Sequence, residues 1–212
     1  MNEKTTRPGR RNLREDCVAE GLRIVSERGV EALSLREVAR RLGVSHQAPY
    51  KHFASRDHIL AEMVRQSYAS FAQFLEQRPM TQQPAEDLGA MGEAYLEYAF
   101  AHPLQYRLMF GTPLPPPEDH PAMMEEARYA FGLLQQGISD VHAMRGEPDA
   151  ASRTDFDAMF ILSVLHGLAT IMQSSVLGTL DLAPGAIERM PGETLTRISW
   201  MLGLDDHGEP AS

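Results

Sequence analysis

The side chains of this sequence that could do chemistry gather between Ser34 and Arg56, in SLREVARRLGVSHQAPYKHFASR. Hydroxyl, imidazole, amide and ammonium groups follow one another there, and such groups hydrogen-bond to the base edges and phosphates of DNA. The sequence contains no Glu-x-x-His or His-Glu-x-x-His motif, no glycine-rich phosphate loop and no Gly-x-Ser-x-Gly elbow. The stretch is therefore typical of a motif that places a helix on DNA. The absence of these catalytic and metal-binding motifs argues against an enzyme.

Two short helices about a tight turn are predicted to position these groups. Ser34 and Glu37 form Ser-x-x-Glu, the capping box that satisfies backbone donors at a helix start. Gly43 ends the first helix, because glycine adopts the left-handed conformation of a C-cap without a steric penalty. Ser45 caps a second helix, which is predicted to continue to Phe53.

The first helix has one apolar face. Its apolar residues recur at i, i+3, i+4 and i+7, and they are Leu35, Val38, Ala39 and Leu42. The residues predicted on its solvent side are Arg36, Arg40 and Arg41. In the second helix Pro49 falls within the first turn, where its missing N–H costs little. An ordinary pair of packed helices has the same pattern, so this pattern leaves both interpretations open.

Charge is divided unevenly along the chain. Residues 1–58 hold 12 Lys and Arg against 8 Asp and Glu, whereas residues 59–212 hold 8 against 21. The two parts carry +4 and −13, which sum to the net charge of −9. Because attraction to phosphate depends on the local field, which falls off over about 10 Å at moderate salt, an acidic chain can still bind DNA.

The N-terminus is predicted to be a flexible basic arm. It combines proline and glycine with little apolar content, and its cations include Arg7, Arg10, Arg11 and Arg14. Such an arm can follow a phosphate backbone. A terminus that is merely soluble is the alternative, since Glu3, Glu15 and Asp16 lie in the same region.

Residues 12–65 resemble the tetracycline-repressor (TetR) family of bacterial one-component regulators. The similarity rests on SERGVEALSLREVARRLGVS, on the block APYKHF and on the Ser-Arg-Asp start of a long following helix. The resemblance implies an all-α fold, with a basic arm and a three-helix helix-turn-helix DNA-binding domain in residues 1–58. Residues 59–212 would form a helical bundle for effector binding and dimerisation. It further implies a ligand-responsive repressor that binds a palindromic operator in double-stranded DNA as a homodimer.

The resemblance also implies which side chains touch DNA. Ser34 would cap a helix near a phosphate, and Arg56 stands where the family most often has lysine. The groove-facing residues would be Ser45, His46, Gln47 and Ala48, and those that grip the backbone would be Tyr50, Lys51 and His52. Their chemistry suits these roles, because an amide can pair with adenine, a methyl group can meet thymine and an imidazole can donate to guanine. Phe53 is predicted to be a core residue.

Apolar spacing predicts further helices in the rest of the chain, and no strand pattern competes with them. Their approximate ranges are 55–77, 85–101, 103–111, 121–145, 152–178 and 183–203, with a proline-rich loop at 112–121. A row of small residues in the helix at 152–178 would let another helix approach closely: Ser163, Gly167, Thr170, Ser174 and Gly178. With the last helix, this row predicts a four-helix contact between two subunits. Packing within one chain is the alternative.

The C-terminal part also resembles a TetR-type ligand domain named for a Trp-His-Gly signature. The similarity rests on YRLMFG at 106–111 and on the pair His166-Gly167, while the tryptophan is replaced around Leu162. The resemblance implies a pocket for a small hydrophobic effector, with candidate lining residues Met91, Tyr95, Tyr98, Phe110, Met124, Phe131, Phe160 and His166. The same residues suit a solid core. Control by a partner protein in place of a small ligand also stays open.

Composition indicates a cytoplasmic protein. The single cysteine, Cys17, permits no disulfide within the chain and is predicted to be buried. Charged residues stand where a secretory leader would be apolar. The apolar run at 158–172 is too short for a membrane span, so no membrane anchor is predicted. Neither a metal nor any other cofactor is predicted.

Overall fold

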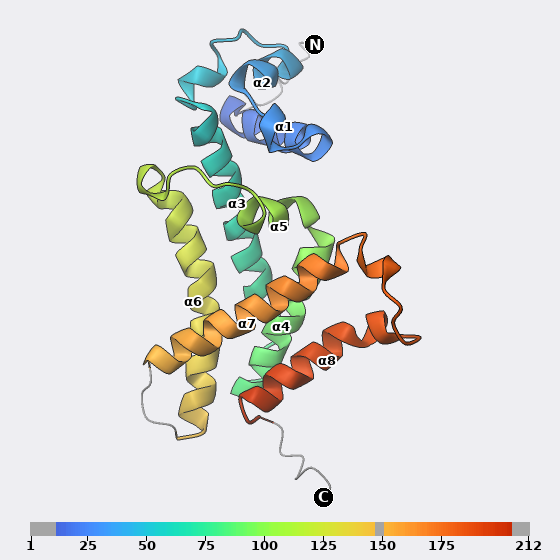
Figure 1. The fold of residues 1–212 in the computed structure, drawn as a ribbon. Coiled ribbons are helices and arrows are strands. Elements are labelled where there is room, and N and C mark those ends of the chain that lie inside the picture. Colours follow the sequence, from blue (N-terminus) through green and yellow to red (C-terminus); the bar gives the residue numbers. More distant parts are fainter. Residues whose placement is uncertain (1–11, 147–150, 205–212) are drawn as a thin grey trace, which may run out of the picture. The chain divides into compact units, whose positions relative to one another are not determined.

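Every regular element in the described part of the chain is helical, which confirms the all-α fold class. The computed structural model describes residues 12–146 and 151–204 (Figure 1). Its α-helices are α1 (Leu13–Arg28), α2 (Leu35–Leu42), α3 (Arg56–Glu76), α4 (Pro84–Ala101), α5 (Pro103–Phe110), α6 (Pro121–Met144), α7 (Ala151–Met172) and α8 (Ala186–Met201). Its short 3₁₀ helices are η1 (Val30–Ala32), η2 (Pro49–Lys51), η3 (Pro117–Asp119) and η4 (Leu177–Thr179).

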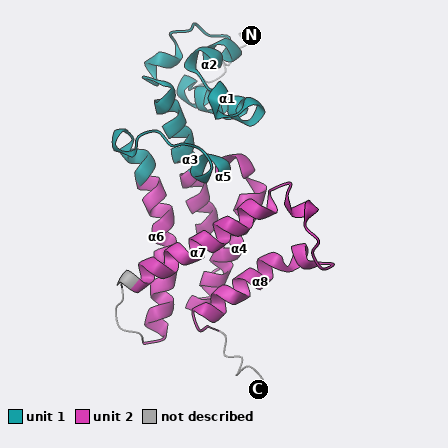
Figure 2. Ribbon diagram, in the orientation of Figure 1, with its two compact units in different colours: residues 1–67, 107–124 teal, residues 68–106, 125–212 magenta. Residues whose placement is uncertain are grey.

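The chain divides into two compact units (Figure 2). Unit 1 comprises residues 1–67 and 107–124, and unit 2 comprises residues 68–106 and 125–212. The middle of the chain thus returns a segment to the N-terminal unit. The functional division predicted at residue 58 concerns which part binds DNA, and it stays a prediction.

The core of unit 1 forms where α1 meets α2 and the start of α3. Gly21 makes the approach of α1 to α3 possible, because a Cβ atom there would lie 3.0 Å from the sulfur of Met63. Cys17 is fully buried, as predicted, and burial raises the pKa of its thiol. Phe53 is also in this core, at 2% exposure. The residues that follow α2 therefore rest on a packed core.

Unit 2 is built on α4, which packs against both α7 and α8. Aromatic rings from the end of α3 fill its interior. Phe71 lies against Tyr95 and Tyr98, with ring centroids 5.5 and 5.1 Å apart, and Phe74 lies 5.5 Å from Tyr98. Edge and tilted arrangements of this kind are those that aromatic pairs prefer. These rings therefore pack against one another across α3 and α4.

The predicted helix boundaries hold to within a few residues for α3 to α6 and for α8. The prediction for α7 is wrong at its end, because the helix stops at Met172 and a turn follows. Ser174 and Ser175 occupy this turn, and serine side chains compete with the backbone for helical hydrogen bonds. Ser174 and Gly178 of the predicted small-residue row therefore lie beyond the helix.

Candidate nucleic-acid interface

Helix α2 begins and ends at the residues that its sequence indicates. The Ser34 hydroxyl accepts a hydrogen bond from the Glu37 N–H at 3.2 Å, which confirms Ser34 as the N-cap. Gly43 has φ 67° and occupies the left-handed C-cap position. The Val44 N–H then reaches back to the Ala39 carbonyl at 3.1 Å, the closing bond of a Schellman turn. Ser34 and Gly43 thus cap the two ends of α2.

The predicted second helix from Ser45 to Phe53 is wrong. Residues 46–48 form a turn, and only Pro49–Lys51 form a short 3₁₀ helix, whose N-cap is Ala48. Proline has no N–H to donate to the Ser45 carbonyl, and that carbonyl instead accepts from the Ala48 N–H at 2.9 Å. The result is a tighter coil than an α-helix. We call residues 45–52 the recognition segment.

The recognition segment presents most of its side chains to solvent. Ser45, His46, Gln47, Lys51 and His52 are exposed, Tyr50 is exposed over 46% of its surface and Ala48 is half-buried. Pro49 points inward and is buried. The imidazole Nε2 of His46 and the amide Nε2 of Gln47 are 3.1 Å apart and hydrogen-bonded. The structure thus collects seven of the nine predicted DNA-contact residues on one short exposed segment.

The arginines of α2 do not all face solvent as predicted. Arg41 has 18% side-chain exposure and pairs with Glu27 at 2.8 Å, Glu37 at 3.1 Å and Glu20 at 3.5 Å. Arg40 also pairs with Glu37, at 2.8 Å. Hydrogen bonds from Arg40 and Arg41 lower the pKa of Glu37 to about 2. Arg41 therefore joins α2 to α1, whereas the charge of Arg40 is paired within α2.

Two cations of unit 1, one on α2 and one in the recognition segment, are exposed and form no ion pair in the described residues. Within residues 12–146 and 151–204, neither Arg36 on α2 nor Lys51 in η2 forms an ion pair, and both are exposed. Such cations are the groups that bind phosphates along a DNA backbone. Of the predicted arm, Arg14 begins α1, whereas Arg7, Arg10 and Arg11 lie outside the described residues.

Arg56 differs from the other predicted DNA contacts because its guanidinium is already engaged. Its Nε donates to the Leu33 carbonyl at 3.2 Å and its Nη2 to the Val30 carbonyl at 2.9 Å. Its Nη1 lies 3.4 Å from Asp57 Oδ1. Ser34 is half-buried beside this contact and acts as a cap. Arg56 therefore holds backbone of its own unit in the free chain.

A charged brace joins α1 to α3 beneath the recognition segment. Glu62 is 8% exposed and accepts two-nitrogen contacts from both Arg14 (3.1 and 2.9 Å) and Arg65 (3.1 and 2.9 Å). The Arg14 guanidinium also lies 5.4 Å from the centroid of the Phe53 ring. Burial raises the pKa of Glu62, but the hydrogen bonds from Arg65, Arg14 and Gln66 outweigh it and lower the pKa to about 2.

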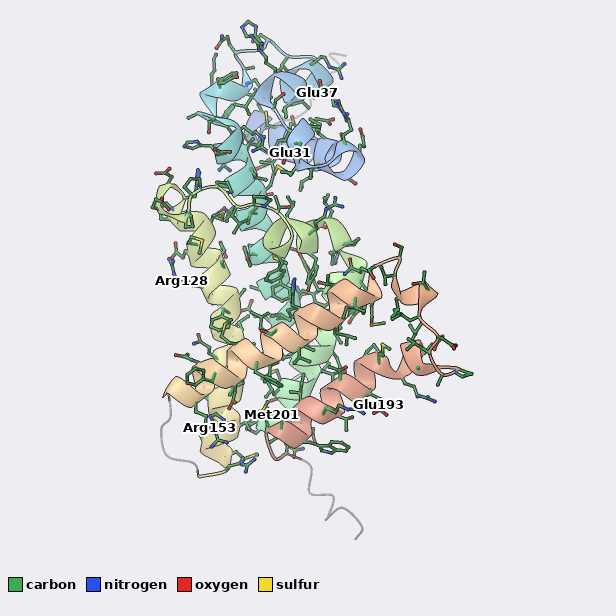
Figure 3. The ribbon with its side chains drawn as sticks, viewed as in Figure 1. Glu31, Glu37, Arg128, Arg153, Glu193 and Met201 are labelled. Atoms are coloured by element: carbon green, nitrogen blue, oxygen red, sulfur yellow. The ribbon has the colours of Figure 1, made fainter. Side chains whose placement is uncertain are left out.

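We expect this brace to make unit 1 sensitive to acid. Because the pKa of Glu62 falls from 4.5 to about 2 on folding, its carboxylate stabilises the fold above pH 4.5 and loses that effect as pH falls towards 2. Glu62→Gln should lower the free energy of unfolding at neutral pH by about 1–3 kcal/mol, since it leaves two arginines without their acceptor. Chemical denaturation followed from pH 7 to acid should show this difference shrinking. Glu31→Gln, at an exposed position labelled in Figure 3, is the control and should show no such convergence.

The predicted effector-pocket residues fall into different surroundings. Met91, Tyr95 and Tyr98 are buried in unit 2, and Phe131 and His166 are partly buried there. Phe110 and Met124 belong to unit 1, and Phe160 is exposed over 50% of its surface. The structure therefore brings together only part of the predicted set.

Tyr106 is a buried residue that the sequence-based set omits. Its hydroxyl is 3.1 Å from the Tyr95 hydroxyl and 2.6 Å from His166 Nδ1, and its ring stacks on the imidazole with centroids 5.5 Å apart. Burial lowers the pKa of His166 and raises that of Tyr106. The YRLMFG motif contains this tyrosine, but its partner lies 60 residues away in sequence. This hydrogen-bonded chain joins α4, α5 and α7.

Helix α7 exposes an uncharged face from Phe156 to Ile171. Its exposed residues follow helical spacing and are Phe156, Met159, Phe160, Ser163, Thr170 and Ile171, and the half-buried Gly167 lies among them. The opposite face packs inside unit 2. Over Arg153–Met172 the mean hydropathy is 1.4, and only 22% of this stretch is buried. By length and composition this helix could cross a membrane, although apolar helices of folded domains pass the same test.

Two family models match the chain. The model for bacterial regulatory proteins of the tetR family matches residues 18–63, and that for a tetracyclin repressor-like C-terminal domain matches residues 88–190. The HTH-type transcriptional regulator Rv1816 of Mycobacterium tuberculosis is 30% identical over 120 residues, which are 53% of this chain and 51% of that protein. The chain spans about half the length of the curated relatives that it matches.

Solved structures resemble almost the whole chain. A protein from Rhodococcus sp. RHA1 matches with a TM-score of 0.70 and 27% identity, over 94% of this chain and 97% of that one. The regulator FadR from Bacillus subtilis, solved in complex with stearoyl-CoA, matches with a TM-score of 0.65 and 12% identity, over 87% and 96%. At 12% identity the similarity concerns the fold alone.

Proposed function

The chain belongs to the TetR family of bacterial regulatory proteins, and from this membership we propose that it is a cytoplasmic, ligand-responsive repressor that binds a palindromic operator as a homodimer. The observation that carries the DNA-binding part is the recognition segment, residues 45–52. Its polar side chains are exposed, its buried Pro49 packs against the core of unit 1, and Lys51 within it is an exposed cation. Members of this family regulate transcription and are not enzymes.

Within this proposal the exposed residues divide into two roles. Gln47 and His46 read base edges, and the Ala48 methyl group meets a thymine methyl. Lys51, His52 and the Tyr50 hydroxyl contact phosphates, which fix the register of the protein on the duplex without reading sequence. Because the recognition segment is short and tightly coiled, its exposed side chains lie close together. We therefore propose that they enter the major groove together.

We expect selection of bound sequences from random DNA to yield a palindrome with two half-sites about one helical turn, roughly 34 Å, apart. Gln47→Ala should relax the preference at one position of each half-site, with a discrimination loss of about 1–3 kcal/mol per contact. Gln73→Ala, at an exposed glutamine of α3 in unit 2, is the matched control and should leave the selected sequence unchanged. If Gln47→Ala selects the same DNA sequence as the wild type, Gln47 does not read a base.

The effector part of the proposal rests on the interior of unit 2. Phe71 packs against Tyr95, which begins the polar chain formed by Tyr95, Tyr106 and His166, and such a mixture of apolar and polar groups suits an apolar ligand with one polar group. Effector binding would favour one of two conformations of the chain and thereby change operator affinity.

A thermal-shift screen with apolar compounds, including fatty-acyl thioesters, tests this part directly. A ligand that binds the folded chain should raise its melting temperature and release it from the operator. Release that requires a protein partner and no small molecule would favour the alternative mechanism.

A further inference from the structure

Arg56 occupies a junction in unit 1. It is the first residue of α3, and residues 53–55 connect it to the recognition segment. Its side chain meanwhile bonds to the carbonyls of Val30 and Leu33, 26 and 23 residues earlier. Leu33 directly precedes the N-cap Ser34. The side chain of Arg56 therefore closes a ring of chain that contains all of α2 and the recognition segment.

The carbonyls of Val30 and Leu33 both accept a hydrogen bond from Arg56. The Val30 carbonyl ends the η1 turn by accepting the Leu33 N–H at 3.1 Å, and its second lone pair accepts from Arg56 at 2.9 Å. Leu33 has extended backbone, with φ −69° and ψ 121°, and its side chain is 1% exposed. A guanidinium can reach both oxygens because its donors stand on separate nitrogens in a planar fork.

We propose that Arg56 is a positioning residue for DNA recognition. By fastening the chain ahead of Ser34 to the start of α3, it sets where α2 and the recognition segment emerge from unit 1. This role rests on the proposed DNA-binding function. It differs from a phosphate contact, because the bonds that matter are made to Val30 and Leu33 within the protein.

Lysine is the informative substitution at this position. Arg56→Lys keeps the positive charge, so a phosphate contact would largely survive it. All donors of lysine stand on one nitrogen, so the two-nitrogen contact at 2.9 and 3.2 Å is lost. Lys51 offers the matched comparison, since it is exposed and makes no ion pair in the described residues.

The test measures affinity of the full chain for its selected operator and for mixed-sequence DNA over a range of salt concentrations. We expect Arg56→Lys and Arg56→Gln to weaken operator binding by about tenfold or more, the equivalent of one hydrogen bond to a charged group. Both should leave mixed-sequence binding and the salt slope near the wild-type values. Lys51→Gln should weaken both kinds of binding and reduce the salt slope by about 1, whereas Lys51→Arg should restore both.

Unfolding would give a different signature, because it weakens operator and mixed-sequence binding in proportion. Hydrogen exchange of the amides at 29–34 in the DNA-free chain supplies an independent measurement, and both Arg56 variants should accelerate it. The proposal is overturned if Arg56→Lys binds the operator as the wild type does, or if exchange accelerates without loss of operator affinity. If the wild type selects no DNA sequence at all, the proposed function fails, while the exchange measurement still reports on the ring closure.

Discussion

Phe160→Glu combined with Ile171→Glu should convert the protein to a monomer and weaken operator binding by about 10²–10⁴-fold. Both residues lie on the uncharged face of α7, with 50% and 52% exposure in the single chain. Trp200, at 59% exposure on α8, extends the apolar surface to the other helix of the four-helix contact that the sequence predicts. A carboxylate buried in such a contact lacks a partner, which costs several kcal/mol. A monomer also loses the gain that comes from holding two half-sites at once.

Sedimentation and operator titration check this result together. Met80→Glu is the control, because this methionine is equally exposed, at 59%, and lies between α3 and α4, outside α7 and α8. The control should remain dimeric and bind normally. If the variant with both Phe160→Glu and Ile171→Glu remains a dimer, the subunit contact does not involve this face of α7. Figure 3 labels Glu193 and Met201 on α8, whose exposed residues would share the contact.

Phe53→Ala should lower the free energy of unfolding of unit 1 by about 3–5 kcal/mol. Phe53 is 2% exposed, it directly follows the recognition segment and its ring lies beneath the Arg14 guanidinium. Removing the ring leaves a cavity next to the recognition segment. It also removes the contact between the ring and Arg14, which pairs with Glu62. Phe53 belongs to unit 1, so we expect the loss of unfolding free energy to appear in unit 1 and not in unit 2.

Denaturant titration with hydrogen exchange separates the two units in this measurement. Tyr50→Ala removes an aromatic ring only three residues away, but that ring is 46% exposed. It should cost under about 1 kcal/mol of stability and act instead on operator affinity. Equal destabilisation by the two substitutions would contradict the assignment of Phe53 to the core and Tyr50 to the surface.

Features that depend on neighbouring residues could be predicted from the sequence. Ser34 caps α2 through a bond to Glu37, and Gly43 ends it with φ 67°. The boundaries of α3 to α6 and of α8 were predictable for the same reason, whereas the end of α7 was not. The second helix differs from the prediction because Pro49 has no N–H for the Ser45 carbonyl, which accepts the Ala48 N–H in a tighter coil.

The roles of charged and polar side chains were harder to predict. Arg41 sits on the predicted solvent side of α2, but Glu27, 14 residues earlier, captures it at 2.8 Å. Arg56 aligns with a family lysine, yet its donors reach Val30 and Leu33. Tyr106 is hydrogen-bonded to His166, which lies 60 residues later in the sequence. Helical spacing carries no information about which distant groups will face each other.

The sequence by itself determined that the chain is helical, that α2 lies between Ser34 and Gly43, and that an exposed polar segment follows it. Caps, periodicity and turn residues act over a few positions, so their consequences can be derived locally. Only the tertiary structure decided which cations stay available to DNA, and that residues 107–124 join the N-terminal unit. Those outcomes depend on which segments pack together, because a long arginine side chain bonds to whatever acceptor the fold brings within its reach.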